Sequence, residues 1–174
     1  MSSFDELLSE QIGHEFAASQ QYIAIAVWFD AHDLPRLAGY FYRQSREERN
    51  HAMMLVQYRL DRGMRVTIPA IPDVVNDFAN VREPLALALA QEKTVSDQIQ
   101  ALFSAARAEN DGLGEQAMLW FLKEQVEEIA SMQTLLNVAE RTDNLFDIEN
   151  FVARETADAS STDSDGPSAA GGTV

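Results

Sequence analysis

No cysteine occurs in the 174 residues of the chain. This absence excludes disulfides, thiolate-bound zinc, iron–sulfur clusters and a cysteine nucleophile, and it agrees with a cytoplasmic location. Long apolar runs are also missing, so we expect no membrane span, and the first residues do not have the pattern of a secretory signal. Basic residues are few, with 13 Lys and Arg against 28 Asp and Glu and a net charge of −15. A phosphate-binding face needs clustered basic residues, so we expect no nucleic-acid partner.

The acidic excess allows two interpretations. It can simply keep the protein in solution, or it can form a surface that attracts cations. With 46% apolar residues, the chain can build one full core, and its length suits one domain, which we expect to cover residues 1–157. Residues 158–174 are small and polar. They offer too little apolar surface to offset the entropy of ordering, so we expect a disordered tail.

Apolar residues recur at steps of three and four in four long segments, the pattern of the inward face of a helix. A glutamate interrupts each of these faces, at Glu15, Glu48, Glu92 and Glu128. Burying an unpaired carboxylate is costly, and Arg and Lys are nearly absent from the same faces. A bound metal ion is the simplest source of the missing positive charge.

Turn signals separate the helical segments. Pro35 and Pro84 suit the first turn of a helix, Asp33 suits a helix cap, and Gly63 suits a helix end. Residues 64–81 are too many for a hairpin turn and predict a crossover along a bundle. The sequence gives little sign of strands. We expect helices over about residues 4–32, 34–62 and 82–110, a fourth that ends near residue 141, and a short fifth over 145–155.

Positions along the chain predict that the four glutamates meet. Glu15 and Glu48 lie at similar distances from the turn at residue 33, and Glu92 and Glu128 lie at similar distances from the turn at residue 111. In an antiparallel hairpin, such residues lie at similar heights. His51 follows Glu48 at i+3, so both side chains project from one face and can chelate one ion. A sulfur-free, carboxylate-rich set suits iron or manganese, and four carboxylates balance the charge of two divalent ions.

The combination of glutamates on two helices and Glu-x-x-His is typical of carboxylate di-iron bundles. Over about residues 5–155, the segments EQIGHEFAASQQY, SREERNHAMML, AQEKTVSDQ and FLKEQVEEIASM resemble those of the non-haem bacterial ferritins. The resemblance implies an all-α, ferritin-like four-helix bundle with a long crossover loop and a short fifth C-terminal helix. It further implies a ferroxidase that stores iron. Such a protein oxidises Fe(II) with oxygen or peroxide and holds ferric mineral in a homo-oligomeric shell of 24 subunits.

The same resemblance implies a ferroxidase centre with two iron ions in each subunit and with Glu48 as the bridge between them. The implied ligands are Glu15, Glu48 and His51 for the first iron, and Glu48, Glu92 and Glu128, with Gln125 beside them, for the second.

Five further residues match positions with accessory roles in such ferritins. Glu47, Glu124 and Glu127 match a third, transient iron site, although glutamate is also a favoured residue on exposed helix faces. Tyr22 matches a tyrosine that takes part in electron transfer, and Trp120 matches a nearby tryptophan. For both aromatic residues, packing in the core is the alternative role.

Two positions depart from related patterns. Ser131 stands where a symmetric di-iron site has a histidine, and Arg49 stands where bacterioferritins have the methionine that binds haem. The resemblance is therefore to a ferritin without haem. The first iron has the imidazole of His51, whereas the second has at best the amide oxygen of Gln125. Imidazole binds Fe(II) more strongly than an amide oxygen does, so we expect the second iron to be held more weakly than the first.

Some alternatives remain open in the sequence. The acidic residues Glu109, Asp111 and Glu115 can form a solvated loop or, near the three-fold pores of a ferritin shell, an entry route for ions. The chain could also be a di-iron or di-manganese oxidoreductase that reacts with peroxide and has no storage role. A metal-free helical interaction protein is the second rival.

Overall fold

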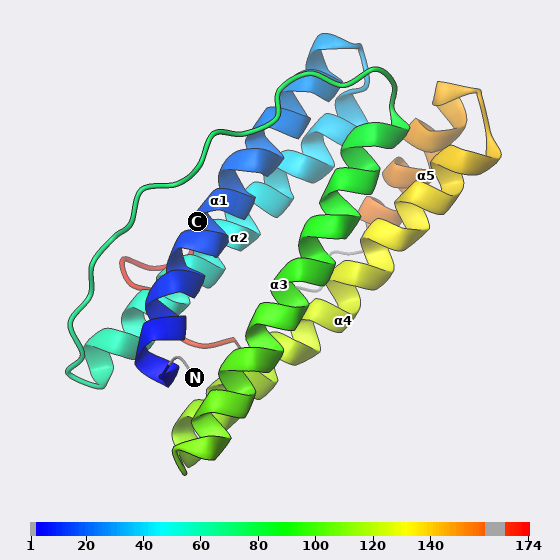
Figure 1. The fold of residues 1–174 in the computed structure, drawn as a ribbon. Helices are drawn as coiled ribbons and strands as arrows, with labels where there is room; N and C mark the ends of the chain where they lie inside the picture. The colour runs from blue at the N-terminus through cyan, green and yellow to red at the C-terminus, as the bar shows by residue number, and fades with distance from the viewer. Residues whose placement is uncertain (1–2, 159–165) are drawn as a thin grey trace.

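The computed structural model describes residues 3–158 and 166–174, apart from the side chains of residues 157 and 158 (Figure 1). No strand occurs in these ranges, so the predicted all-α fold is confirmed. None of the helices found there has both the length and the apolar character needed to cross a membrane. The helices are α1 (Phe4–Ala31), α2 (Pro35–Asp61), α3 (Arg82–Ala108), α4 (Gly112–Arg141) and α5 (Leu145–Asp158).

Two antiparallel hairpins form the bundle, α1 with α2 and α3 with α4 (Figure 1). A long crossover leads from the end of α2 along the bundle to the start of α3. The short α5 packs against α2 and α4. This is the predicted four-helix bundle with a crossover and a fifth helix.

The turns within the two hairpins use different devices. Asp33, which we expected to cap α2, instead has a φ of 58°, and Leu34 precedes the helix without a side-chain cap. Aspartate adopts this left-handed conformation more readily than most residues, so it serves as the turn residue. In the second hairpin, the Asp111 side chain accepts a hydrogen bond from the Gly114 amide at 3.1 Å and does cap α4.

The apolar core is divided into two clusters by a polar layer. One cluster contains Tyr22 and Phe41, and the other contains Ile12 and Leu55. Along α1 and α2, the glutamate of each helix lies between members of the two clusters, and the same order recurs in α3 and α4. The helices therefore bring all four interrupting glutamates to one level of the bundle.

The crossover is fixed to α1 near this level. The side-chain amide of Gln21 donates a hydrogen bond to the Val75 carbonyl at 2.8 Å, and the backbone amide of Val75 donates one to the side-chain oxygen of Gln21 at 2.8 Å. A Cβ on Gly13 would lie 2.9 Å from Cγ of Pro69, so a larger residue there would push the crossover away. These contacts seal the outer side of α1.

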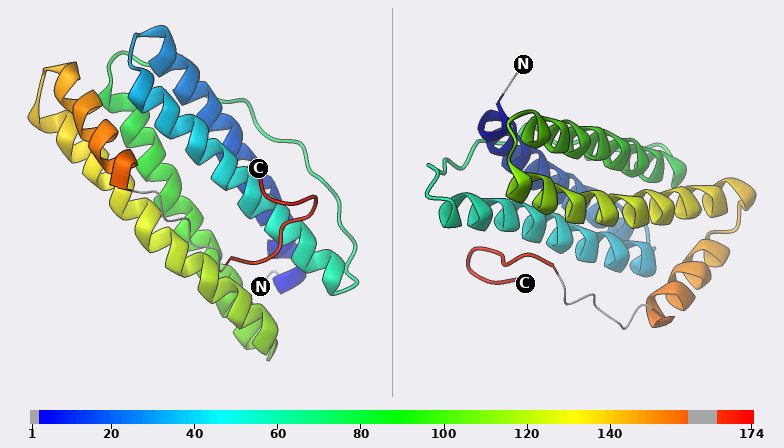
Figure 2. Two further views of the ribbon diagram at one scale, coloured as in Figure 1. Left: turned by 180° about the vertical axis from the view of Figure 1, so that it is seen from behind. Right: turned by 90° about the horizontal axis from the view of Figure 1, so that it is seen from below.

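The end of the chain differs from its prediction. Residues 159–165 of the expected disordered tail lie outside the described residues, but residues 166–174 lie along α2 (Figure 2). The Ala170 amide donates to the Met53 carbonyl at 3.0 Å, and Ala169 and Ala170 pack against the cluster that contains Leu55. Small side chains were read as a lack of packing surface. Here they allow the backbone to approach α2 closely.

Candidate metal centre

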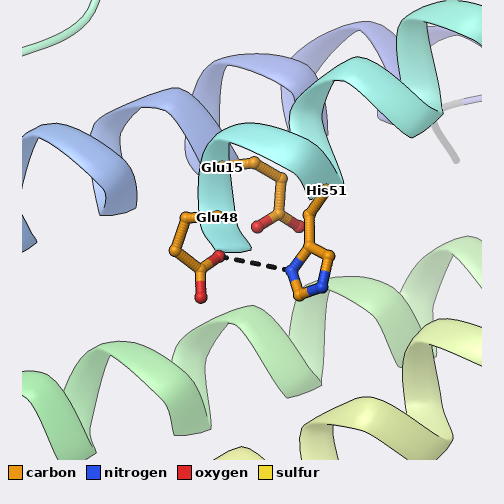
Figure 3. A group of neighbouring side chains, drawn as sticks. All are labelled: Glu15, Glu48 and His51. Atoms are coloured by element: carbon orange, nitrogen blue, oxygen red, sulfur yellow. Dashed lines mark ion pairs between the residues drawn. The ribbon is translucent and has the colours of Figure 1, made fainter. Parts of the chain in front are cut away.

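The first group of candidate ligands comes from the first hairpin. Glu15 projects from α1, while Glu48 and His51 project from α2 (Figure 3). They are buried, with exposed fractions of 1%, 0% and 6%, and one ligand atom from each lies within 4.8 Å of the others. The His51 Nδ1 atom is 3.5 Å from Oε2 of Glu48. Helical i+3 spacing accounts for this approach.

The second group joins the two hairpins. Ligand atoms of Glu48, Glu92 and Glu128 also lie within 4.8 Å of one another. Glu48 thus belongs to both groups, and Nδ1 of His51 lies 4.0 Å from Oε1 of Glu128 on the other side. The four interrupting glutamates and the histidine predicted from the sequence therefore converge within the bundle.

Hydrogen bonds hold three of the carboxylates from outside the centre. Gln11 donates to Glu15 at 2.8 Å, Tyr22 donates to Glu92 through a short hydrogen bond, and Gln125 donates to Glu128. Such outer contacts fix the orientation of metal ligands.

Three buried carboxylate oxygens have no hydrogen-bond partner in the part of the chain that the structure describes. They are Oε2 of Glu15 and both oxygens of Glu48. A buried, unsatisfied carboxylate oxygen is costly unless a cation or a proton satisfies it. The oxygens left without hydrogen-bond partners therefore belong to Glu15 and Glu48, which are both members of the first ligand group, and this arrangement suits metal binding.

Proton affinities in the metal-free centre follow from burial and from the mutual repulsion of the acids. Burial, and then the charges of Glu128, Glu92 and Glu15, raise the pKa of Glu48 well above its ordinary value. The pKa of Glu128 is raised for the same reasons. Burial raises the pKa of Glu92 to about 7, although the hydrogen bond from Tyr22 opposes this shift. Protons thus occupy the centre when cations do not.

His51 responds in the opposite direction. Burial lowers the pKa of its imidazole, which keeps the ring neutral near pH 7. A neutral imidazole has a free nitrogen lone pair and is the form that binds metal ions.

Comparison with known proteins identifies the family of the chain. The family model described as "Ferritin-like domain" matches residues 5–142. The chain is 59% identical over 174 residues to "Ferritin BfrB" of Mycolicibacterium smegmatis, which covers 99% of this chain and 96% of that relative. It is 58% identical over 172 residues to a Mycobacterium tuberculosis protein named "Bacterioferritin BfrB", covering 98% of this chain and 94% of the relative. The chain belongs to the ferritin family. Iron storage and the oxidation of Fe(II) are therefore its functions.

A solved structure agrees in fold. An open pore ferritin from the archaeon Archaeoglobus fulgidus superposes with a TM-score of 0.83 at 24% identity, covering 87% of this chain and 94% of that chain. Family membership favours the ferritin interpretation over the two rivals, the peroxide-reacting oxidoreductase and the metal-free interaction protein.

The residues predicted for a third iron site are less closely associated in this ferritin. Glu47 retains 42% of its side-chain exposure and accepts a short hydrogen bond from Gln44, while Glu127 is exposed. Among the described residues, Glu47, Glu124 and Glu127 do not form a group with converging ligand atoms. Their role in a third site stays a prediction.

The two aromatic residues contact the centre in different ways. Tyr22 is fully buried, packs against Phe41 with a centroid separation of 5.5 Å, and also donates its hydroxyl hydrogen to Glu92. Trp120 meets the His51 ring edge to face at 5.9 Å. Packing is thus a role of both residues, and it places both beside candidate ligands.

Ser131 differs from its expected position. The three- and four-residue spacing that places Glu128 on the inward face of the fourth helix also predicts Ser131 there, but Ser131 is exposed, whereas Met132 is buried in the core. Ser131 lines a pocket of about 220 Å³ between α4 and α5, together with Tyr40 and Phe151. The serine therefore faces a pocket whose lining includes none of the residues of the two ligand groups.

The acidic residues at the second turn have partners within the chain. Glu109 accepts a hydrogen bond from the backbone amide of Phe4 at 2.8 Å. Asp111 caps the start of α4 by accepting a hydrogen bond from the Gly114 amide. Asp111 also pairs with Arg62 at 3.0 Å, and Glu115 pairs with Arg107 at 3.0 Å. These contacts show that the three acidic side chains stabilise the ends of helices. An entry route for ions here stays a prediction.

Gln11 is a site residue that the sequence analysis missed. It is 1% exposed and donates to Glu15, one helical turn further along α1. A signal was available, because Gln11 lies between Leu8 and Glu15 on the side of the helix that carries buried residues. A glutamine four residues before a buried glutamate can be expected to orient it.

Proposed function

We propose that the two groups form an intrasubunit ferroxidase centre that takes two Fe(II) ions as substrate. The first position uses Glu15, Glu48 and His51. The second uses Glu48, Glu92 and Glu128, with Gln125 as the residue that orients Glu128. The observation that carries this proposal is the state of Glu48, which is fully buried, common to both groups, and without a hydrogen-bond partner among the described residues for either oxygen.

Hard anionic oxygen ligands favour Fe(III) over Fe(II), because the more highly charged ion gains more from them. The centre therefore lowers the reduction potential of the bound iron and drives its oxidation. Two Fe(II) ions supply two electrons, which reduce one oxygen molecule to peroxide or one hydrogen peroxide molecule to water. The phenol of Tyr22, bonded to Glu92, is the residue placed to pass an electron to or from the second position.

The two positions are unequal in this proposal. Only the first has a nitrogen ligand, since Ser131 supplies none to the second. We expect the first position to fill first. A weakly held second iron suits a storage protein, which must pass oxidised iron onward to the mineral.

The protein binds no haem in this proposal, although one close relative is named a bacterioferritin. Support comes from Arg49, which directly follows Glu48 where haem-binding relatives have methionine. A guanidinium cannot supply the soft thioether ligand. The expected result after incubation with haem is a spectrum without a Soret band.

The mineral is held inside a shell of 24 subunits, and the protein is cytoplasmic. Support for the shell comes from apolar side chains exposed on the single subunit, including Val27 and Val75 on α1 and the crossover, and Phe146 on α5 at 77%. Contact with neighbouring subunits would remove these apolar side chains from water. Native mass spectrometry gives the subunit number directly.

Substitution of the shared and nitrogen ligands tests the proposed function. Glu48→Ala and His51→Ala should abolish rapid Fe(II) oxidation, with the larger effect at Glu48, while the shell still assembles. Stopped-flow absorbance of Fe(III) formation measures the initial rate. Glu140→Ala is the matched control, because Glu140 is an exposed glutamate on α4. A normal initial rate in either ligand variant would show that oxidation occurs elsewhere.

A further inference from the structure

The segment formed by residues 166–174 lies along α2 (Figure 2). Two contacts fix it there. The Ala170 amide donates to the Met53 carbonyl at 3.0 Å. Asn50 exchanges hydrogen bonds with the backbone of Val174, donating at 3.4 Å and accepting at 3.2 Å. Because Asn50 and Met53 flank His51 in the sequence, the segment is attached on both sides of the nitrogen ligand.

A second line of contacts reaches the imidazole itself. Gly166 lies so close to Trp120 that a Cβ there would be 2.9 Å from Cζ2 of the indole. The same position would be 3.5 Å from Cε of Met54. Trp120 in turn meets His51 edge to face at 5.9 Å, with an interplanar angle of 81°. The segment therefore contacts the indole of Trp120, and the indole contacts the imidazole of His51.

The carboxylate side of His51 does not hold the ring by itself. Its Nδ1 atom is 3.5 Å from Glu48 and 4.0 Å from Glu128, which are ion-pair distances and longer than a good hydrogen bond. The aromatic side is closed by Trp120 and by Phe121, whose ring lies 5.7 Å from the imidazole. The rotamer of His51 thus depends on how firmly these two rings are packed.

We propose that residues 166–174 are a positioning element of the ferroxidase centre, which holds Trp120 against His51 and so keeps the imidazole aimed at the first iron. This inference rests on the role of His51 proposed above. Ligands lose affinity when their supporting contacts are loosened, because the rotamer must then be ordered at the moment of binding. The segment acts through Trp120 and has no contact with iron in this proposal.

Two substitutions loosen the segment without altering a ligand. Ala170→Pro removes the amide hydrogen that Met53 accepts, whereas Ala170→Ser keeps it and serves as the conservative match. Gly166→Leu forces the indole to move, because the added Cβ would overlap it. Thr173→Ala is a control within the segment, since Thr173 is exposed. The four helices should fold and assemble in all of these variants.

Anaerobic Co(II) titration of the full-length protein measures metal binding at the first position. The absorption of Co(II) bound there is the part of the spectrum that is lost in His51→Ala. We expect Ala170→Pro and Gly166→Leu to weaken this Co(II) binding about two- to fivefold. The emission of Trp120, measured in a Trp28→Phe background, should shift in both variants. Ala170→Ser and Thr173→Ala should match the unsubstituted protein in both measurements.

Wild-type Co(II) affinity in Ala170→Pro and Gly166→Leu would overturn the inference, whether or not their melting temperature falls. Equal weakening in the two control variants would also overturn it, because the effect would then lack the predicted specificity. Failure of the proposed function has a different signature. In that case His51→Ala itself would leave the Co(II) spectrum and the rate of Fe(II) oxidation unchanged.

Discussion

Glu48 shows how a single residue can require a metal. It has no exposed surface, and neither of its oxygens has a hydrogen-bond partner in the described part of the chain. Without a cation, the residue must take up a proton, as the raised pKa indicates. The same holds to a lesser degree for Glu92, whose pKa is raised to about 7. The metal-free protein therefore carries an electrostatic cost that iron at the proposed centre would remove.

That cost predicts how the stability of the metal-free protein depends on pH. A carboxyl with a raised pKa binds more protons in the folded than in the unfolded state, so stability falls as pH rises from the unfolded pKa through the folded one. For Glu92 the window runs from about 4.5 to about 7. Its full contribution is on the order of 3 kcal/mol. Urea unfolding should therefore show a less stable metal-free protein at pH 8 than at pH 6.

Glu48→Gln is the control for this pH dependence, because it removes one titrating carboxyl and the charge that repels the others. The variant should show a smaller loss of stability between pH 6 and pH 8, and Co(II) should stabilise the unsubstituted protein most at the higher pH. Stability that rises over this interval would contradict the account of a repulsive, proton-holding centre.

Ser131 gives a gain-of-function prediction at the same scale. Ser131→His should tighten the second position, since it adds an imidazole one helical turn after Glu128, at an exposed residue that can be replaced by a larger one. A tenfold gain in affinity corresponds to about 1.4 kcal/mol, within the range of an added ligand. Anaerobic Fe(II) titration measures it, with Ser131→Asn as a polar control. Unchanged affinity in the histidine variant would show that the side chain cannot reach the ion.

At the scale of elements, the sequence predicted the helices well and the packing of residues 166–174 poorly. Helical periodicity located the bundle because four amphipathic faces repeat over many turns. The turn at Asp33 was misassigned because aspartate suits both a helix cap and a left-handed turn residue. Packing of residues 166–174 escaped prediction because it depends on contacts with α2 and with Trp120, which no local pattern encodes.

Some residues of the candidate site could likewise be predicted from the sequence, and others could not. The four glutamates and His51 were predictable because a charge on an apolar face is conspicuous, and helical spacing fixes their heights. Gln11 was missed because a single glutamine carries no charge to compensate. Ser131 was misplaced because the strict spacing drifts along a long helix, so that Met132 takes the buried position.

The crossover gives a prediction for a connecting element. Gln21→Ala removes both hydrogen bonds to Val75 and should cost about 1–3 kcal/mol of local stability. The crossover should then open more often, so trypsin should cleave after Arg65 faster than in the unsubstituted protein. Gln20→Ala is the matched control, because the neighbouring Gln20 is exposed. Equal cleavage rates in the two variants would show that other contacts, such as Gly13 with Pro69, suffice.

At the scale of the whole molecule, the bundle combines two requirements. The two apolar clusters provide the stability of an ordinary helical core, while the polar layer between them holds side chains that an ordinary core would exclude. Docking of the two hairpins completes the layer, since Glu48 comes from the first and Glu92 and Glu128 from the second. Folding thus assembles the proposed ferroxidase centre, and assembly of the proposed shell would give its product a place to accumulate.

The most direct test of this account is a crystal of the protein soaked anaerobically in Fe(II), with iron located by its anomalous scattering. We predict two iron peaks within each subunit, both within bonding distance of Glu48. One should lie beside Glu15 and His51 and the other beside Glu92 and Glu128, and the first should be the more occupied at low iron. Iron bound only elsewhere on the subunit, with these residues free of metal, would contradict the account.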